Sequence, residues 1–141
     1  MERAVVDASV AIKWTIEENN SQEALHLAAR TLLIAPHLML TECGNILWRK
    51  ARLGEITPQA AVDWHADLAL VPVEYMDDHA LLPKALALAV RLDHPVYDCL
   101  YVAASLECGA PLVTADARLH RKLLASGGLA VAPVLLSELK S

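Results

Sequence analysis

Four acidic side chains stand at positions from which they could hold one metal site. Asp7 and Asp116 each follow a short apolar run, Asp98 lies near the start of a predicted helix, and Glu42 lies in the first turns of another. Carboxylates that gather in one place repel each other unless a cation neutralises them, and hard oxygen ligands suit Mg²⁺ or Mn²⁺. A divalent ion there would lower the pKa of a bound water and polarise a phosphoryl oxygen. The set therefore points to phosphodiester hydrolysis.

A purely structural role is available to each acid. Asp7, Asp98 and Asp116 stand near predicted helix starts, where an aspartate N-cap contributes about 1 kcal/mol and gains from the helix dipole. Glu42 could be a solvated residue early in its helix. Capping explains the set less well than it explains each acid singly. Asp7 and Asp116 are expected at one sheet edge, and the apolar neighbours of Glu42 favour its burial.

The elements that must position these acids alternate between short apolar strands and helices. The expected strands are Arg3–Asp7, Leu32–Ala35, Val71–Glu74 (near an edge, because of Pro72), Leu112–Thr114 and Leu129–Ala132. The expected helices are Ala8–Ile16, one from Asn20 or Ser21 to Arg30, Leu38–Leu53, one opened by Thr57 and Pro58, one from Asp77 or Asp78 to Arg91, Tyr97–Glu107 and Ala117–Ala125. This alternation predicts an α/β fold with a parallel sheet covered on both faces. Ligands bind such sheets at the carboxyl ends of the strands, where the strand order reverses.

The bulk composition bounds the class of protein. A chain of 141 residues is expected to form one domain, residues 1–141, with a real core. It is 55% hydrophobic, yet no apolar run approaches the roughly 20 residues that a membrane span needs, and we expect no signal peptide. The three cysteines are odd in number and lack CxxC spacing. They predict free thiols in a reducing, cytoplasmic environment rather than disulfides or a zinc site.

The charge balance argues against broad electrostatic binding to nucleic acid, because the net charge is −5. Bound divalent cations can reverse the sign of a local site, so a nucleic-acid substrate is not excluded. The chain contains no phenylalanine and few other aromatics, so base stacking on an aromatic platform is not expected. Arg118, Arg121 and Lys122 form a basic cluster just after Asp116. The cluster is either a solvated helix face or a contact for the phosphate backbone of RNA.

Other motifs of catalysis are missing from the sequence. The six histidines have no HxH or HExxH spacing, and there is no GxSxG and no P-loop. His94 and His120 are nearest to the acids and are expected to be surface or loop residues. Trp14, Trp48 and Trp64 are expected to anchor the core or an interface rather than to stack on bases.

Four motifs in order along nearly the whole chain carry a family resemblance. The chain resembles the PilT N-terminus (PIN) domain nucleases, in particular the small VapC-type ribonuclease toxins. The matching segments are Val5-Val6-Asp7-Ala8-Ser9, Leu40-Thr41-Glu42-Cys43-Gly44-Asn45, Pro95-Val96-Tyr97-Asp98-Cys99-Leu100-Tyr101 and Leu112-Val113-Thr114-Ala115-Asp116-Ala117-Arg118. Each motif is weak alone, and the ordered four are fairly specific.

The resemblance implies a fold, a site and partners. The fold would be a three-layer α/β/α sandwich with a mostly parallel sheet of about five strands. The carboxylates that hold the metal would be Asp7, Glu42, Asp98 and Asp116, supported by Ser9, Thr114 and Asn45. The partners would be RNA, a second copy in a homodimer and an antitoxin encoded beside the toxin. Residues Ala117–His120 hold no acid where some relatives carry one, so the number of metal ions stays open.

The leading hypothesis is a Mg²⁺- or Mn²⁺-dependent endoribonuclease that acts as the toxin of a toxin–antitoxin pair. A PIN nuclease of RNA processing is a second possibility. A third is a Mg²⁺-dependent aspartyl-phosphate domain, although Asp7-Ala8-Ser9 lacks the second aspartate of a phosphatase DxD pair. The fourth is a non-catalytic interaction module whose acids only cap helices.

Overall fold

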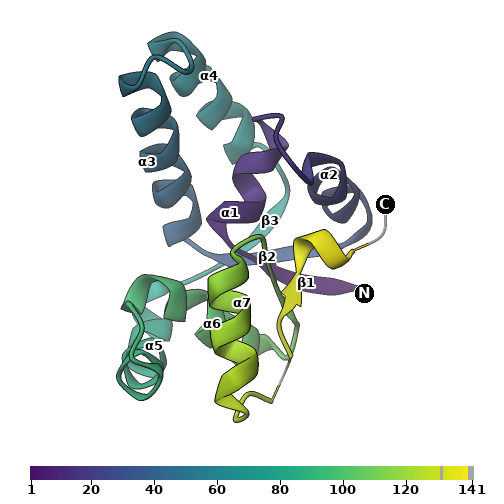
Figure 1. Cartoon of the computed structure of the whole chain (residues 1–141), viewed down its shortest axis with the longest axis vertical. Coiled ribbons are helices and arrows are strands. Elements are labelled where there is room, and N and C mark those ends of the chain that lie inside the picture. Colours follow the sequence, from purple (N-terminus) through teal and green to yellow (C-terminus); the bar gives the residue numbers. More distant parts are fainter. Residues whose placement is uncertain (131, 140–141) are drawn as a thin grey trace.

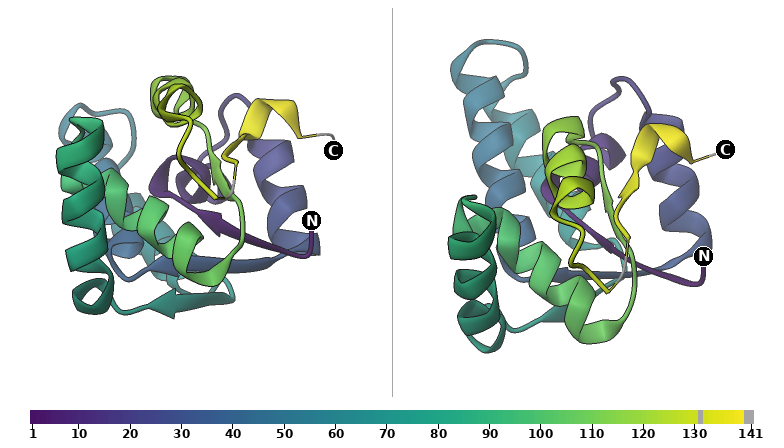
Figure 2. Two further views of the ribbon diagram at one scale, coloured as in Figure 1. Left: turned by 90° about the horizontal axis from the view of Figure 1, so that it is seen from below. Right: turned by 60° about the horizontal axis from the view of Figure 1, so that its bottom comes forward.

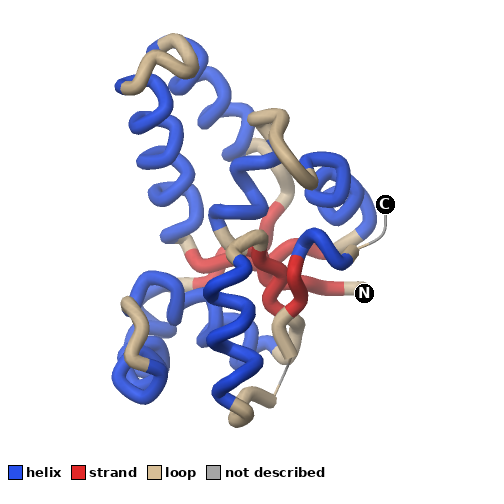
Figure 3. The backbone as a smooth tube through the Cα atoms, in the orientation of Figure 1, coloured by secondary structure: helices blue, strands red, loops and turns tan. Residues whose placement is uncertain are grey.

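Five short strands form one parallel sheet at the centre of the molecule, shown in red in Figure 3. The computed structural model describes residues 1–130 and 132–139. The strands, in the order in which they lie side by side, are β3 (Val73–Met76), β2 (Leu32–Pro36), β1 (Arg3–Val6), β4 (Leu112–Thr114) and β5 (Val134–Leu135). Each neighbouring pair is parallel.

Helices cover both faces of this sheet, which gives the predicted three-layer α/β/α sandwich (Figure 1). One face carries α1 (Ala8–Ala11), α2 (Ser21–Arg30), α3 (Leu38–Arg52) and α4 (Pro58–Ala69). The other face carries α5 (Asp78–Leu92), α6 (Val96–Cys108) and α7 (Ala117–Ser126), with α5 packed along α6 (Figure 2). Two 3₁₀ turns, η1 (Ile12–Trp14) and η2 (Leu136–Glu138), complete the described elements.

The central strands are buried because each carries an almost continuous apolar run. Ala4, Val5 and Val6 of β1 have no exposed surface, and the side chains of β4 are buried as well. A strand that is covered on both faces cannot alternate apolar with polar side chains, as an antiparallel strand on one face of a core does. Within the described residues, no helix is long and apolar enough to cross a membrane.

The strand order reverses at the middle of the sheet. From β1 the chain proceeds outward through β2 to β3, and then returns to the opposite side of β1 to form β4 and β5. The carboxyl ends of β1 and β4 therefore lie side by side at the point where ligands of such sheets bind. Val6 is in register with Val113, so Asp7 and Thr114 follow from neighbouring strands.

The helix boundaries follow local capping signals in most cases. Thr57 accepts a hydrogen bond from the N–H of Ala60 at 3.0 Å and caps α4, as its sequence predicts. Asp77 caps α5. Asn20 precedes α2 in a left-handed conformation and provides no side-chain cap. Gly109 ends α6 with φ 69°, a conformation that glycine adopts without strain.

Three predicted elements are placed wrongly. The third strand is Val73–Met76, two residues later than predicted, so Pro72 precedes it instead of lying within it; the strand is at the sheet edge as predicted. The first helix ends at Ala11 and continues as a 3₁₀ turn. The fifth strand is Val134–Leu135 rather than Leu129–Ala132, because the chain must first return from the far end of α7 to the sheet. Val131, within the predicted strand, lies outside the described residues.

Candidate active site at the carboxyl edge of the sheet

Asp7 is held at the centre of the site by two neighbouring hydroxyl groups. It follows β1, is 5% exposed, and caps α1 by accepting from the N–H of Val10 at 3.3 Å. Ser9 donates to its Oδ1 and Thr114 to its Oδ2, each at 2.5 Å. Since Thr114 ends the adjacent strand β4, the parallel register of β1 and β4 brings this hydroxyl to Asp7 from 107 positions away.

Burial dominates the electrostatics of Asp7. The pKa of Asp7 is raised from 3.8 to about 6, because loss of solvation on burial and, to a smaller extent, the charge of Asp98 outweigh the hydrogen bonds from Ser9, Thr114 and Val10, which lower it. A buried carboxylate with few hydrogen bonds would be still harder to ionise. Asp7 is therefore an acid for which a bound cation would be a favourable partner.

Glu42 comes to the site from the second turn of α3, where it is half-buried. Its Oε1 accepts a hydrogen bond from the hydroxyl of Tyr101 at 2.5 Å. Burial raises the pKa of Glu42, the Tyr101 bond lowers it and the charge of Asp98 raises it. Burial and the nearby Glu42 raise the pKa of Tyr101 in turn, so its hydroxyl keeps the proton that it donates.

Asp98 lies in the first turn of α6, and its charge acts on Asp7 and Glu42. Its Oδ2 is 2.6 Å from Nε2 of His94, and the two side chains are 34% and 17% exposed respectively. The N-cap of α6 is Pro95, so the predicted capping role of Asp98 is wrong. Asp98 is free of that structural task because the helix begins two residues earlier, at Val96.

Asp116 caps α7, the structural role considered for it, and also lines the same hollow as Asp98. Its Oδ1 accepts from the N–H groups of Arg118 and Leu119 at 2.9 and 3.1 Å. Its own N–H donates to Oγ1 of Thr114 at 3.1 Å, and that hydroxyl contacts Asp7. Thr114 thus joins the two acids that follow neighbouring strands.

Three of the four acids open onto two separate hollows, whereas Asp7 is buried and lines neither. Asp98 and Asp116 line a hollow of about 410 Å³ between α6 and α7, which we call the α6–α7 hollow; its other lining residues are Asp93, His94, Pro95, Arg118, Leu119 and Lys122. Glu42 and Asn45 line a second hollow of about 460 Å³, the α3–α6 hollow, together with Leu38, Thr41, Ile46, Arg49 and Tyr97. The sequence-predicted acids are thus near each other but do not share one cavity.

The oxygen-rich donor set fits Mg²⁺ or Mn²⁺ in its chemistry. Within residues 1–130 and 132–139, no three His, Cys, Asp or Glu side chains already stand close enough together to hold a metal ion. Mg²⁺ keeps several waters and takes one or two carboxylates directly, so it needs no closed cage of four. Cysteine is a poor candidate ligand here, because burial raises the pKa of Cys43 to about 12.

The basic cluster is divided by the structure. Arg118 and Lys122 line the α6–α7 hollow with Asp98 and Asp116, whereas Arg121 is exposed and is not among the lining residues. Nζ of Lys122 donates to the backbone carbonyl of Asp93 at 2.6 Å. Arg118 is therefore the member of the cluster best placed to meet a phosphate beside the acids.

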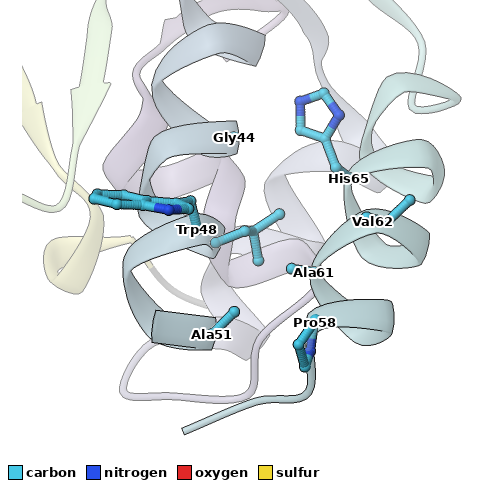
Figure 4. Close-up of a pocket in the computed structure, with 8 residues that line it drawn as sticks. Gly44, Trp48, Ala51, Pro58, Ala61, Val62 and His65 are labelled. Carbon is cyan, nitrogen blue, oxygen red and sulfur yellow. The ribbon is translucent and has the colours of Figure 1, made fainter. Parts of the chain in front are cut away.

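A third cavity contrasts with these hollows. The α3–α4 groove, of about 390 Å³, lies between α3 and α4 (Figure 4). Its lining residues are Gly44, Leu47, Trp48, Ala51, Pro58, Ala61, Val62 and His65, and none of them is acidic. Trp48 is 54% exposed and Arg52 lies over its ring.

Sequence reasoning missed three contacts of the site. His94 meets Asp98, Tyr101 donates to Glu42, and Arg49 lines the α3–α6 hollow. The i, i+4 spacing of His94 and Asp98 was visible in the sequence, but the bond from Tyr101 spans 59 positions and needed the fold. His120, predicted to be a surface or loop residue, is buried in α7 because it faces the core side of that helix.

Known proteins resemble this chain over most of its length. The family model for the PIN domain matches residues 4–123. Ribonuclease VapC1 of Mycobacterium tuberculosis is 31% identical over 99% of this chain and 98% of its own length. Exonuclease VapC9 of Pyrobaculum aerophilum is 34% identical over 66% of this chain and 68% of its own length.

Solved structures share the architecture. The crystal structure of PAE2754 from Pyrobaculum aerophilum matches with a TM-score of 0.70 and 26% identity, covering 96% of this chain and 85% of that one. A structure of VapBC2 from Rickettsia felis, bound to a DNA fragment from their promoter, matches with a TM-score of 0.58 and 12% identity over 94% and 96% of the two chains, and shows the fold alone. With the ordered motifs and the reversed strand order at Asp7, these matches establish that the chain belongs to the PIN domain family, in the group of the VapC ribonucleases.

Proposed function

We propose that this protein is a Mg²⁺- or Mn²⁺-dependent endoribonuclease and the toxin of a toxin–antitoxin pair. The observation that carries the proposal is the convergence of acids from different elements at the edge where the strand order reverses: Thr114 joins Asp7 to Asp116, and Asp116 shares a hollow with Asp98. The charge of Asp98 raises the pKa of both Asp7 and Glu42. Independent helix caps need not interact in this way, whereas a cation between the carboxylates would relieve both effects.

In this proposal Asp7 and Asp98 hold the principal metal ion, and Glu42 and Asp116 complete or widen the set. When bound, the divalent ion supplies an acidic water and neutralises charge on the phosphate. Ser9 and Thr114 hold both oxygens of Asp7 in place, and Tyr101 holds Glu42. A carboxylate of the set orients the attacking water or accepts its proton. Asn45, one turn after Glu42 in the α3–α6 hollow, would support the same site.

The substrate we propose is RNA, bound across the α6–α7 hollow. Arg118 would contact a phosphate from the α7 wall of the hollow, beside Asp116, and such contacts position a nucleic acid without reading its bases. The exposed Arg121 would contact the backbone farther along. With no phenylalanine and an acidic net charge, we expect recognition of the shape of a looped or folded RNA rather than of stacked bases.

The partners we propose are a cognate antitoxin and a second copy of the chain, in the cytoplasm. The related complex of VapBC2 from Rickettsia felis supports the antitoxin. An acid cluster without its metal attracts a cation, so the antitoxin would mask the site by placing an Arg or Lys among the carboxylates. Expression of the chain should arrest growth, and co-expression of the adjacent reading frame should relieve the arrest. Persistent arrest with that partner would count against the toxin role.

The experiment that tests the reaction uses a circular RNA and a linear RNA of the same sequence, each with Mg²⁺, Mn²⁺ or EDTA. An endonuclease cuts the circle, whereas an exonuclease cuts only the linear form. The exonuclease alternative is tested because the chain is similar to Exonuclease VapC9 of Pyrobaculum aerophilum. We expect metal-dependent cutting of both RNAs. Asp7→Asn and Asp98→Asn should reduce the rate by about a hundredfold or more, as the loss of charge-stabilising groups does.

Two results would overturn the assignment. Cleavage at the parent rate by Asp7→Asn or Asp98→Asn would remove these acids from the reaction. Absence of Mg²⁺ and Mn²⁺ binding in calorimetry, with protein freed of any partner, would favour the non-catalytic interaction module. Asp67→Asn, the same change at an exposed acid of α4 that lines neither hollow, controls for general loss of folded protein.

A further inference from the structure

The turn between α5 and α6 holds His94 in a fixed backbone position. Asp93 ends α5 in the left-handed conformation, with φ 51° and ψ 57°. The N–H of His94 donates to the carbonyl of Ala89 at 3.1 Å, and Pro95, with φ −55°, is the N-cap of α6. A proline pre-sets its own backbone and restricts the residue before it. The backbone of His94 is thus fixed on both sides, four positions before Asp98.

A second helix fastens the same turn. Nζ of Lys122, on α7, donates to the carbonyl of Asp93 at 2.6 Å. Lys122, His94 and Asp98 all line the α6–α7 hollow. The turn is therefore tied to α5 through Ala89, to α7 through Lys122 and to α6 through the His94 side chain.

Each of the other acids has its own donor, and His94 fills this role for Asp98. Ser9 and Thr114 hold Asp7, Tyr101 holds Glu42, and backbone N–H groups hold Asp116. A carboxylate that can rotate must lose that freedom when it binds an ion, and a donor fixed beforehand removes this cost. The contact of 2.6 Å uses Oδ2 of Asp98 and leaves Oδ1 for a ligand.

We propose that His94 is a positioning residue, which holds Oδ2 of Asp98 so that Oδ1 binds the divalent ion. This role rests on the proposed metal-dependent function. His94 acts through Asp98 and need not touch the RNA. The competing explanation is that His94 only fastens the turn to the first turn of α6. The two explanations differ in whether metal affinity depends on the donor.

The test measures Mn²⁺ affinity by calorimetry in the full chain, freed of any partner, for the parent, His94→Leu and His94→Gln. The leucine removes the donor, and the glutamine keeps an N–H at a similar reach. His26→Leu is the matched control, because His26 is a partly buried histidine on α2 in a cavity beside Met1 and Thr31, near the amino ends of β1 and β2. Rates on the circular RNA are measured over a series of Mn²⁺ concentrations.

We expect His94→Leu to weaken Mn²⁺ binding by about tenfold or more, as loss of an outer partner of a metal ligand does. His94→Gln should restore most of the affinity, and His26→Leu should leave it unchanged. The rate of His94→Leu should recover most of its loss at saturating Mn²⁺. If the role of His94 is purely structural, His94→Leu will instead lower the unfolding temperature without changing the Mn²⁺ affinity of the folded protein.

Unchanged affinity in His94→Leu, or equal losses in the leucine and glutamine variants, would overturn the proposal. If circular dichroism shows that His94→Leu does not fold, His94→Gln is compared with His94→Asn, whose amide is too short to reach Asp98. Equal affinities in that pair would also overturn it. If the parent binds Mn²⁺ and cuts RNA and His94→Leu is unaffected, only the positioning role of His94 is ruled out. If the parent neither binds Mn²⁺ nor cuts RNA, the proposed function is ruled out, and the role of His94 with it.

Discussion

Two cavities of nearly equal size differ in the chemistry of their walls. The α6–α7 hollow, of about 410 Å³, presents Asp98, Asp116, Arg118, Lys122 and His94. The α3–α4 groove, of about 390 Å³, is lined mainly by apolar side chains. Its one ionisable side chain, His65, is hydrogen-bonded through Nε2 to the carbonyl of Leu40 at 2.8 Å. Size therefore does not indicate where a reaction occurs, whereas converging charged groups do.

The difference arises from the elements that meet at each cavity. The α6–α7 hollow lies beside the carboxyl end of β4, next to the point where the strand order reverses, so residues of the turn before α6, of α6 and of α7 converge there. The α3–α4 groove lies between consecutive helices of a hairpin that projects from the sheet (Figure 1). A pair of packed helices offers mainly side chains of one apolar stripe. Changes at the site should therefore alter charge-dependent properties, and changes in the groove should alter stability alone.

The largest expected effect in the metal-free protein is at Asp7. Its pKa is raised from 3.8 to about 6 in the folded state, so folding favours the protonated form. The protonated Asp7 stabilises the folded protein fully at pH values below its pKa in the unfolded chain, and this stabilisation is lost as the pH rises through about 6. The difference between the two pKa values corresponds to about 3 kcal/mol. In EDTA, Asp7→Asn should therefore exceed the parent in free energy of unfolding by about 1–3 kcal/mol at pH 7.5.

This advantage should shrink as the pH falls toward 4, because the parent then carries a neutral Asp7 as well. Urea unfolding at both pH values measures it. Mn²⁺ should stabilise the parent at pH 7.5 but have little effect on Asp7→Asn. A difference between the two proteins that does not change with pH would show that burial does not raise the pKa of Asp7.

Arg118 should have the next largest effect. Arg118→Ala should weaken RNA binding by about tenfold, or 1.4 kcal/mol, and reduce the dependence of log K on log salt by about 0.7, the value for one phosphate contact on a single strand. Arg121→Ala, on the same helix but outside the hollow, should have a smaller effect. The KM for RNA at several salt concentrations measures both. Equal effects of the two changes would mean that α7 attracts RNA only by general charge.

A change at Tyr101 tests how Glu42 is held. Tyr101→Phe keeps the buried ring but removes the hydroxyl that donates to Glu42, so it should cost about 1 kcal/mol of stability. It should also raise the pKa of Glu42, because that hydrogen bond lowers it. Carbon NMR of the Glu42 carboxyl measures the titration. Tyr97→Phe, on the exposed neighbour in the α3–α6 hollow, should change neither. An unaltered Glu42 titration in Tyr101→Phe would contradict the assignment.

The smallest effect is expected in the groove. Gly44 lies within α3, and a Cβ there would meet Nε2 and Cδ2 of His65 at 3.6 and 3.7 Å, which is ordinary contact. Gly44→Ala should stabilise the protein by about 0.5–1 kcal/mol through helix propensity and leave RNA cleavage unchanged. Thermal unfolding and the cleavage rate measure the two properties. A loss of cleavage in a stable variant would connect the groove to the reaction.

The sequence by itself determined the class of fold, most element boundaries and the identity of the acids worth testing. Strand β4 is placed as predicted, and the caps Thr57 and Asp77 are confirmed, because apolar runs and capping are short-range signals. The same locality explains the misplaced fifth strand. An apolar segment after Gly128 looks like a strand, but its pairing with β4 depends on where the chain returns to the sheet.

Only the tertiary structure decided which groups donate hydrogen bonds to the acids and which hollow, if any, each acid lines. It joined Thr114 to Asp7 and Tyr101 to Glu42, separated Arg118 from Arg121, and set Asp98 and Glu42 in different hollows. These contacts depend on the register of parallel strands and on packing between distant helices, which no local pattern encodes. The sequence predicts acids at a sheet edge, and the fold supplies the donors that hold them.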